Sequence, residues 1–357
     1  MKPLTDIWPN LTAFGNLWLA WRKARRGKSR SKGAVLFEMD LERNLIQLQT
    51  ELEAASYRPG AYRLFTIYER KPRLIAAAPF RDRVVHHALM NIIEPPIDRT
   101  FIFDSYACRR GKGVHAAVNR YQAWSQRYAY ALKLDIRRYF PSIDHCLLKA
   151  QLAKRIADDK VLGLLNLIID NTPQHSPQDL VYFLGDDLFT PMERTCGIPI
   201  GNLTSQFFAN VYLDGLDHAI KDKLGVRAYL RYVDDMVLLA DDKPKLWAWR
   251  DWVADYLSGM RLSLHLNRAK VCRVQEGVDV LGYRVFPHRR LLRNENGLRF
   301  RRRLRGFAKG YAKHRLNWPD INPSVQAWIG HACHADTFDL RREIFSSIRF
   351  KRERASR

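Results

Sequence analysis

The chain has 357 residues, 46% hydrophobic and 27% charged, which indicates a soluble globular protein of two or three domains. No run of eighteen apolar residues and no signal-peptide pattern is present, and the five cysteines lack metal spacing, so we expect a reduced, cytoplasmic protein without membrane spans. A formal net charge of +23 favours an anionic partner, nucleic acid first and an anionic membrane surface second.

Two segments concentrate the positive charge. Residues 22–33 hold seven basic residues and no acid, and residues 288–315 form a second block broken by one Glu. Charge gathered in blocks favours a surface for a polyanion over general solubility. From residue 286 to 357 the chain has 18 Lys and Arg against 6 Asp and Glu, and we predict a separate, small, helical, basic domain there.

The first hundred residues predict helices around one hairpin. Residues 10–57 carry apolar positions at helical spacing, interrupted by the first basic block, which predicts two helices joined by a basic loop. Residues 57–79 predict a β-hairpin that turns at Lys71–Pro72. A helix that follows is expected to end at Pro95, and the next helix to open at Gly113.

The middle of the chain alternates helices with a strand. Residues 128–140 alternate in polarity, which predicts a strand whose second face ends at Asp135. A helix capped by Ser142 or Asp144 follows, and residues 202–224 have the apolar stripe of a long helix.

The last part of the chain begins with a strand, an Asp-Asp turn and a second strand over residues 229–240. After one more helix, residues 262–274 and 279–286 are each predicted to form a strand. The helix of the basic domain is expected to begin with Asn322 as its cap and Pro323 at its first position.

Three aspartates, Asp135, Asp234 and Asp235, lie at the ends of predicted strands. Neighbouring strands can bring them together, where one carboxyl group would protonate unless cations neutralise the site. Two Mg²⁺ ions prefer such oxygen ligands and can stabilise both the attacking and the leaving oxygen of a phosphoryl transfer. Asp234–Asp235 taken alone is more typical of a solvated hairpin turn, and it is the joint pattern that favours a metal site.

Three segments in a fixed order carry a family resemblance: "LDIRRYFPSID" (134–144), "GIPIGNLTSQ" (197–206) and "YVDD" (232–235). The chain resembles reverse transcriptases. Residues 200–206 are similar to the pattern of diversity-generating retroelements, whereas other reverse transcriptases usually have Gln in place of Ile200. No appended endonuclease, intron-maturase segment or retron thumb motif is evident, which argues against group II intron proteins and retrons.

The resemblance implies an α+β right-hand polymerase fold with fingers, an antiparallel-sheet palm and a helical thumb. The domains expected are an N-terminal helical, basic extension (1–57), fingers and palm (58–285), and a basic helical thumb (286–357). Phosphate contacts by this thumb would hold the template–primer duplex without sequence preference.

The resemblance also assigns the metal site. Asp135 and Asp234 would bridge two Mg²⁺ ions, for which Mn²⁺ is a substitute, and Asp235 would be the second acid of the turn. The backbone of Ile136 would face the metals. Lys270 matches the lysine that protonates the leaving pyrophosphate, although the family's Lys-Thr is Lys-Val here.

Further residues would bind the incoming nucleotide. Phe140 matches the aromatic ring that excludes a 2′-hydroxyl group, and its alternative is an ordinary core phenylalanine. Lys71 and Arg73 match the cations that hold the triphosphate, and their alternative is a solvated hairpin tip. Gly201 would let the backbone approach the nascent base pair, and Gln206 would fix helix geometry or the template strand.

Ile200 is our candidate for the error spectrum of this subgroup, which miscopies template adenines. Replacing a polar residue by Ile removes a contact that penalises a wrong base pair. The alternative role is plain apolar packing at a helix start.

The resemblance also assigns the template and the primer. Arg81 and Arg83 would touch template phosphates or pair with Asp82. The "LGY" segment, Leu281, Gly282 and Tyr283, would grip the 3′ end of the primer.

The function implied is an RNA-directed DNA polymerase that copies a template-repeat RNA into adenine-mutagenised cDNA for diversification of a target gene. The partners implied are template RNA, the cDNA primer, deoxynucleotides and a basic, pentameric accessory variability protein. The alternatives are a reverse transcriptase with a role in phage defence or linked to CRISPR, and a non-catalytic nucleic-acid-binding scaffold. The three intact aspartates argue against the scaffold.

Overall fold

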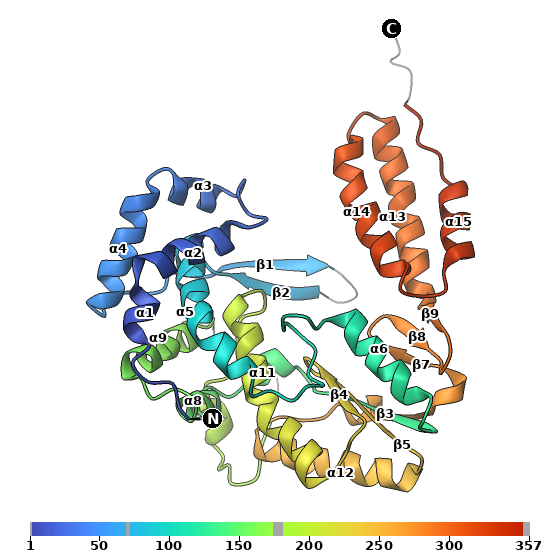
Figure 1. The fold of residues 1–357 in the computed structure, drawn as a ribbon, viewed down its shortest axis with the longest axis horizontal. Coiled ribbons are helices and arrows are strands. Elements are labelled where there is room, and N and C mark those ends of the chain that lie inside the picture. The colour runs from blue at the N-terminus through green and yellow to red at the C-terminus, as the bar shows by residue number, and fades with distance from the viewer. Residues whose placement is uncertain (1, 69–71, 174–180, 353–357) are drawn as a thin grey trace. The chain divides into compact units, whose positions relative to one another are not determined.

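A computed structural model describes residues 2–68, 72–173 and 181–352 (Figure 1). Contacts divide the chain into two compact units. The first unit comprises Met1–Arg109, Leu134–Met236 and Trp249–Ala269, and the second comprises Arg110–Lys133, Val237–Ala248 and Lys270–Arg357. Within the described residues no helix is both long and apolar enough to cross a bilayer. The three-domain division expected from the sequence stays a prediction.

The N-terminal part of the first unit is helical. Its helices are α1 (Trp8–Thr12), α2 (Phe14–Arg25), α3 (Lys32–Glu38), α4 (Leu41–Glu53) and α5 (Phe80–Asp98). The basic loop expected between two helices lies between α2 and α3, but the segments on either side are each broken once more, because Ala13 and Asp40 leave the helical region of backbone space. Helix α2 packs against α5 through Leu17, Ala20 and Ala24.

Helix α5 does not end at Pro95, contrary to the prediction. It continues through Pro95 and Pro96 to Asp98. Both prolines fall in the last turn, where the missing N–H groups remove few hydrogen bonds and no further turn has to be built on them. The helix packs its buried face, Val84, Val85, Ala88, Leu89 and Ile93, against the surrounding helices.

The predicted hairpin is confirmed. Strands β1 (Arg63–Tyr68) and β2 (Pro72–Ala77) pair antiparallel, with Arg63 opposite Ala77 and Tyr68 opposite Pro72. Every side chain of β1 is exposed, and β2 becomes buried only toward Ala76. The hairpin is therefore packed near its base, around Ala76, and not along its length.

The remaining helices of the first unit are α7 (Tyr139–Ser142), α8 (His145–Ala153), α9 (Asp159–Asp170), α10 (Thr190–Glu193), α11 (Leu203–His218) and the π-helical turn Ala219–Lys223. Asp144, one of the two caps predicted, accepts the backbone N–H of Leu147 at 3.0 Å. Helix α11 is buried along most of its surface, as its apolar stripe predicted.

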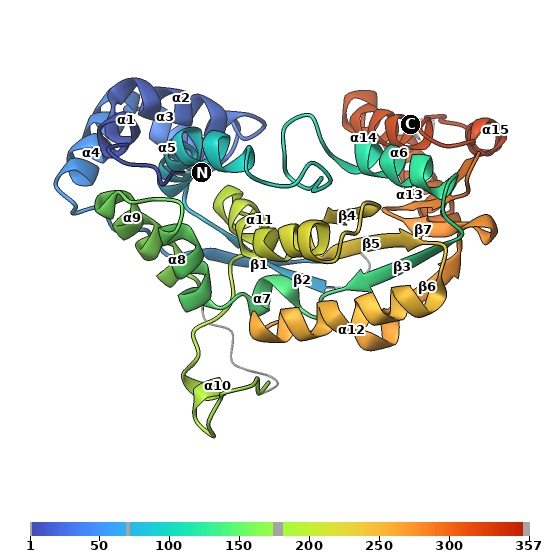
Figure 2. The same cartoon turned by 60° about the horizontal axis from the view of Figure 1, so that its bottom comes forward.

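Four strands form one sheet in the order β4-β5-β3-β6, and Figure 2 shows β5 and β3 side by side. The strands are β3 (Tyr130–Asp135), β4 (Tyr229–Tyr232), β5 (Asp235–Ala240) and β6 (Lys270–Arg273). Helix α12 spans Lys243–Gly259. The predicted strand at 262–274 is shorter than expected, because Leu266–Arg268 form a 3₁₀ turn and only β6 pairs with β3.

In the second unit, helix α6 (Val114–Ser125) accompanies a three-stranded sheet of β7 (Val278–Val280), β8 (Tyr283–Val285) and β9 (Arg290–Leu292). The helix follows Gly113, as predicted. The single strand predicted over 279–286 is wrong. Leu281 and Gly282 both have positive φ, 46° and 97°, which makes a two-residue turn of the type that joins β-hairpins.

Three helices complete the second unit: α13 (Asn294–Ala312), α14 (Trp318–Ala332) and α15 (Phe338–Ser346). The predicted start at Asn322 is wrong, because α14 begins earlier, with Asn317 as its N-cap five residues before Asn322. There Asn317 and Asp320 form a capping box, and Pro323 lies inside the helix. Phe300 of α13 stacks on Trp328 of α14 with ring centroids 3.9 Å apart, which anchors the two helices to each other.

Candidate active site

The turn between β4 and β5 presents Asp234 on a strained backbone. Val233 and Asp234 separate the two strands, and Val233 has φ 57°. This left-handed conformation is uncommon for a β-branched residue and persists only where the surroundings impose it. The predicted strand, turn and second strand are thus present, but the turn consists of Val233 and Asp234, and Asp235 already begins β5. The turn is held by contacts that the sequence did not predict.

Arg231 supplies those contacts from inside the protein. Its side chain is fully buried, and its guanidinium binds both carboxylate oxygens of Asp217 on α11, with the shortest contact at 2.6 Å. Nη1 also donates to the carbonyl oxygen of Val233 at 3.0 Å and to the side chain of Asn210, and Nη2 donates to Ser105. All five N–H groups of the guanidinium are engaged.

A buried ion pair is costly to desolvate, so its hydrogen bonding decides whether it is tolerated. Burial by itself lowers the pKa of Arg231, but the Asp217 carboxylate outweighs that effect and holds the pKa above its usual range. Tyr229 donates a further hydrogen bond to Asp217 at 2.6 Å. The charged pair is therefore fixed, and through the Val233 carbonyl it fixes the turn.

Asp135 lies at the end of β3, where the sequence predicted it. Its carboxylate accepts a hydrogen bond from Nη1 of Arg268 at 2.8 Å, and its carbonyl oxygen accepts the backbone N–H of His265 at 2.8 Å. Ile136 forms a β-bridge with Leu264. The segment before β6 is thus laid along Asp135, and the half-exposed Arg268 side chain neutralises the carboxylate.

The electrostatics tie the predicted acids to one another. The pKa of Asp234 is raised to about 6, first by burial and then by the negative charges of Asp235 and Asp135, while Arg73 opposes the shift. A buried carboxyl group beside two like charges is an environment that a divalent cation would stabilise. The donor set fits such an ion, although within the described ranges no three acidic, His or Cys side chains converge as ligands.

The residues around Ile200 are bound to the hairpin. The carbonyl oxygen of Ile200 accepts the backbone N–H of Ala76 at 3.1 Å, and the side chain of Asn202 bonds to Ala76 and Ala78. Gly201 has φ 113°, and a Cβ there would lie 2.9 Å from Cγ2 of Ile75. The position therefore requires glycine both for its backbone and for its space.

The other nucleotide-site residues lie in varied surroundings. Phe140 is half-buried in α7, and its carbonyl oxygen accepts the N–H of Ile198 at 3.0 Å. Arg73 in β2 and Gln206 in α11 are exposed. Lys71 lies outside the described residues.

Arg81 and Arg83 are both half-buried on α5. Arg81 pairs with Glu51, a partner that the sequence did not predict, and lies 4.0 Å from Asp82. Its guanidinium also lies over the Tyr57 ring at 5.2 Å. Arg83 donates from Nε to the carbonyl oxygen of Ala78 at 2.9 Å.

In the second unit, Lys270 is exposed and opposes Lys133 in the β3–β6 register. Tyr283 is buried, and its hydroxyl group bonds to His331 at 2.8 Å and to His115 at 3.1 Å. A primer contact by this segment would therefore involve Leu281 and Gly282, which are partly exposed, rather than the Tyr283 ring.

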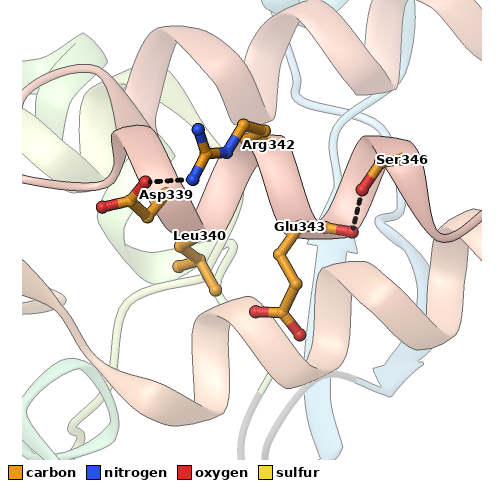
Figure 3. A pocket seen from close by; sticks show the side chains of 5 residues that line it. All are labelled: Asp339, Leu340, Arg342, Glu343 and Ser346. Atoms are coloured by element: carbon orange, nitrogen blue, oxygen red, sulfur yellow. Dashed lines mark hydrogen bonds and ion pairs between the residues drawn. The ribbon is translucent and has the colours of Figure 1, made fainter.

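A hollow of about 610 Å³ on α15 contains none of the predicted site residues (Figure 3). Asp339, Leu340, Arg342, Glu343 and Ser346 of this one helix line it. Arg342 turns toward Asp339, and Ser346 donates to the carbonyl oxygen of Glu343. These hydrogen bonds join residues of the hollow to one another, and its lining does not indicate a catalytic site.

The sheet with its acidic turn and helices defines a right-hand polymerase. A solved structure with this fold is telomerase from Candida tropicalis in complex with a fragment of telomeric RNA, with TM-score 0.50 and 12% identity, covering 87% of this chain and 57% of that one. Residues 67–285 match the family model "Reverse transcriptase (RNA-dependent DNA polymerase)". The match covers more than half of the chain, which therefore belongs to the reverse transcriptase family.

Two curated relatives are similar in sequence. Protein YkfC of Escherichia coli strain K12 is 24% identical over 322 residues, which cover 76% of this chain and 81% of YkfC. Nuclear intron maturase 1 of Arabidopsis thaliana is 31% identical over 86 residues, 24% of this chain and 12% of the maturase. The chain thus spans most of YkfC but a small part of the maturase and less than two thirds of the telomerase.

Proposed function

We propose that this reverse transcriptase serves a diversity-generating retroelement, in which it copies a template-repeat RNA into cDNA that carries errors opposite adenine. The observation that carries the proposal is the segment 200–206, in which Ile200 is hydrogen-bonded to Ala76 of β2 and Gly201 lies close to Ile75. The same strand carries Arg73, which influences Asp234. A nonpolar side chain at this position removes a polar contact that would penalise a wrong base pair, which supports low fidelity.

In this proposal Asp135 and Asp234 hold the divalent ions, Mg²⁺ or Mn²⁺, with Asp235 and the backbone of Ile136 beside them. Bound there, the ions would supply the electrostatic stabilisation that phosphoryl transfer needs. Release of Asp135 from Arg268 accompanies this binding. Arg73, together with Lys71, holds the triphosphate.

The other roles follow the same assignment. The Phe140 ring excludes the 2′-hydroxyl group, Gln206 supports the template strand, and Arg81 and Arg83 contact template phosphates. Lys270 is the acid for the leaving group, and Leu281 and Gly282 contact the primer with Tyr283 behind them. The accessory variability protein and the template-repeat RNA are the partners that this function requires.

The test is primer extension on an RNA template with Mg²⁺ and deoxynucleotides, followed by sequencing of the products, with and without the accessory protein. We expect cDNA from the wild-type chain, none from Asp234→Ala, and errors concentrated opposite template adenine. Ile200→Gln should lower the error rate opposite adenine and leave other errors unchanged. Uniform fidelity in the wild-type chain would contradict the retroelement proposal and leave a reverse transcriptase with another task.

A further inference from the structure

The end of α2 forms an aromatic and basic pocket far in sequence from the polymerase motifs. Trp18, Trp21, Arg22, Arg25 and Arg26 line a hollow of about 540 Å³, which we call the α2 pocket. The helix is labelled in Figure 1. None of these residues belongs to the candidate active site, and all of them lie within the first unit.

The aromatic side chains lie on the exposed face of the helix. Phe14, Trp18, Trp21 and Arg25 follow each other at intervals of three and four residues, which places them along one stripe. Phe14 is 38% and Trp18 41% exposed, whereas Leu17, Ala20 and Ala24 are buried against α5. The core of the unit therefore does not use this stripe.

The two indoles are arranged as an open platform. Their ring centroids are 4.9 Å apart and their planes are inclined at 53°, so the rings do not stack face to face. A large exposed indole such as that of Trp18 loses the free energy that burial would supply. Its place beside the half-buried Trp21, at the mouth of a hollow, leaves aromatic surface available for another flat ring.

Cations surround the platform. The Arg25 guanidinium lies 5.9 Å from the Trp21 ring and is bonded to Glu38 at 2.8 Å. Arg22 and Arg26 are exposed, and among the described residues neither forms an ion pair. The partial negative charge at a helix C-terminus favours cations there but does not account for the exposed Trp18 indole in their midst.

We propose that the α2 pocket binds single-stranded nucleic acid, with a base stacked on Trp18 and the flanking phosphates held by Arg22 and Arg26. Stacking on aromatic rings within a cationic groove is the chemistry by which unpaired strands are bound without sequence preference. A helix lying in a membrane surface needs a broad free apolar face, whereas α2 packs Leu17, Ala20 and Ala24 on α5 and leaves Phe14, Trp18 and Leu19 only partly exposed.

The experiment measures binding to the full-length protein, without polymerisation. Fluorescein-labelled 10-nucleotide RNA and DNA single strands, an RNA duplex and anionic phosphatidylserine vesicles are titrated against the wild-type chain, Trp18→Ala, Trp18→Phe and the double variant Arg22→Gln/Arg26→Gln. Single strands that carry 4-thiouridine or 4-thiothymidine are also cross-linked and the attached peptides identified. Thermal unfolding checks that each variant is folded. Lys154→Gln/Lys160→Gln removes the same charge from exposed positions on other helices.

We expect a cross-link within residues 14–29 and a loss of about tenfold in single-strand affinity for Trp18→Ala, with near wild-type binding for Trp18→Phe. The double arginine variant should lower the slope of log affinity against log salt concentration by the equivalent of about two phosphate contacts. The lysine control should lower that slope less. The RNA and DNA arms decide which strand the pocket prefers.

Unchanged single-strand binding in both pocket variants, with no cross-link to this segment, would overturn the proposal. Binding of vesicles in place of strands, abolished by Trp18→Ala, would overturn it in favour of a membrane surface. Since no step of the assay requires cDNA synthesis, failure here leaves the proposed polymerase function untouched, and failure of primer extension leaves this site untouched.

Discussion

Arg231 donates a hydrogen bond to the carbonyl oxygen of Val233, 3.0 Å away, while the same guanidinium is paired with the buried Asp217. The relationship joins a fixed charge inside the protein to the strained residue that precedes Asp234. The position of the acidic turn therefore depends on Arg231, a buried residue that is assigned no contact with a substrate.

Arg231→Met should remove this support. Asp217 would remain buried without its partner, so we expect the free energy of unfolding to fall by about 3–5 kcal/mol, with a large loss of kcat in primer extension. Chemical denaturation and steady-state kinetics measure the two effects.

The double variant Arg231→Met/Asp217→Leu separates stability from turn geometry. Replacing both charges by apolar groups should recover most of the stability, because no unpaired charge remains. Activity should stay low, since the Val233 carbonyl still lacks its donor. Recovery of full activity together with stability would show that the turn does not depend on Arg231.

Arg268→Ala should strengthen divalent-ion binding. Arg268 neutralises Asp135 at 2.8 Å, so a bound ion has to compete with the guanidinium. Titration with Mn²⁺, followed by electron paramagnetic resonance without nucleotide, should show a several-fold lower dissociation constant. Arg127→Ala, at an exposed position in the second unit, is the matched control. Equal or weaker Mn²⁺ binding by Arg268→Ala would contradict the competition.

Phe140→Ala should relax the choice of sugar. Removing the ring leaves room for a 2′-hydroxyl group, so incorporation of ribonucleotides relative to deoxynucleotides should rise by about tenfold or more. Single-nucleotide extension with each pair of triphosphates measures the ratio. Phe140→Tyr keeps a ring and should retain the wild-type selectivity, and loss of selectivity in that variant would argue for a packing role instead.

His86 should make the protein less stable in acid. Burial first, and then the neighbouring charges of His87 and Arg83, lower the pKa of His86 to about 4, against an ordinary value of 6.5. The unfolded chain therefore binds a proton more readily between these values. Above pH 6.5 this group does not reduce the free energy of unfolding. As the pH falls from 6.5 toward 4, the free energy of unfolding decreases by about 3 kcal/mol.

Denaturant unfolding at pH values from 4 to 8 measures this dependence. His86→Leu should flatten it, because the group that must be protonated on unfolding is gone, while a replacement at the exposed His288 should leave it as in the wild-type chain. An equally steep dependence in His86→Leu would assign the acid sensitivity to other groups.

Local patterns predicted much of the fold. The hairpin of β1 and β2, the Asp144 cap and the strand, turn and strand around Asp234 follow from alternation and capping, which act over a few residues. The Leu281–Gly282 turn was missed because leucine rarely adopts positive φ, so the apolar run looked continuous. The helix start at Asn317 competed with an equally good signal at Asn322.

Long-range pairings were beyond the sequence patterns. The contacts of Arg81 with Glu51 and of Arg268 with Asp135 join segments whose meeting depends on the whole fold. Arg231 could have been suspected, because a charge within the apolar run "YLRYV" has to find a buried partner. Which acid would pair with it was not encoded locally, since Asp214 and Asp217 both lie on the buried surface of α11.

The hairpin of β1 and β2 has a mechanical consequence. Strand β1 is exposed along its whole length and β2 as far as Leu74, and the base of the hairpin is bonded to residues 200–202 through Ala76 and Ala78. Because the hairpin is held at its base, a displacement of the strands near Tyr68 would be transmitted through Ala76 and Ala78 to the loop that carries Ile200.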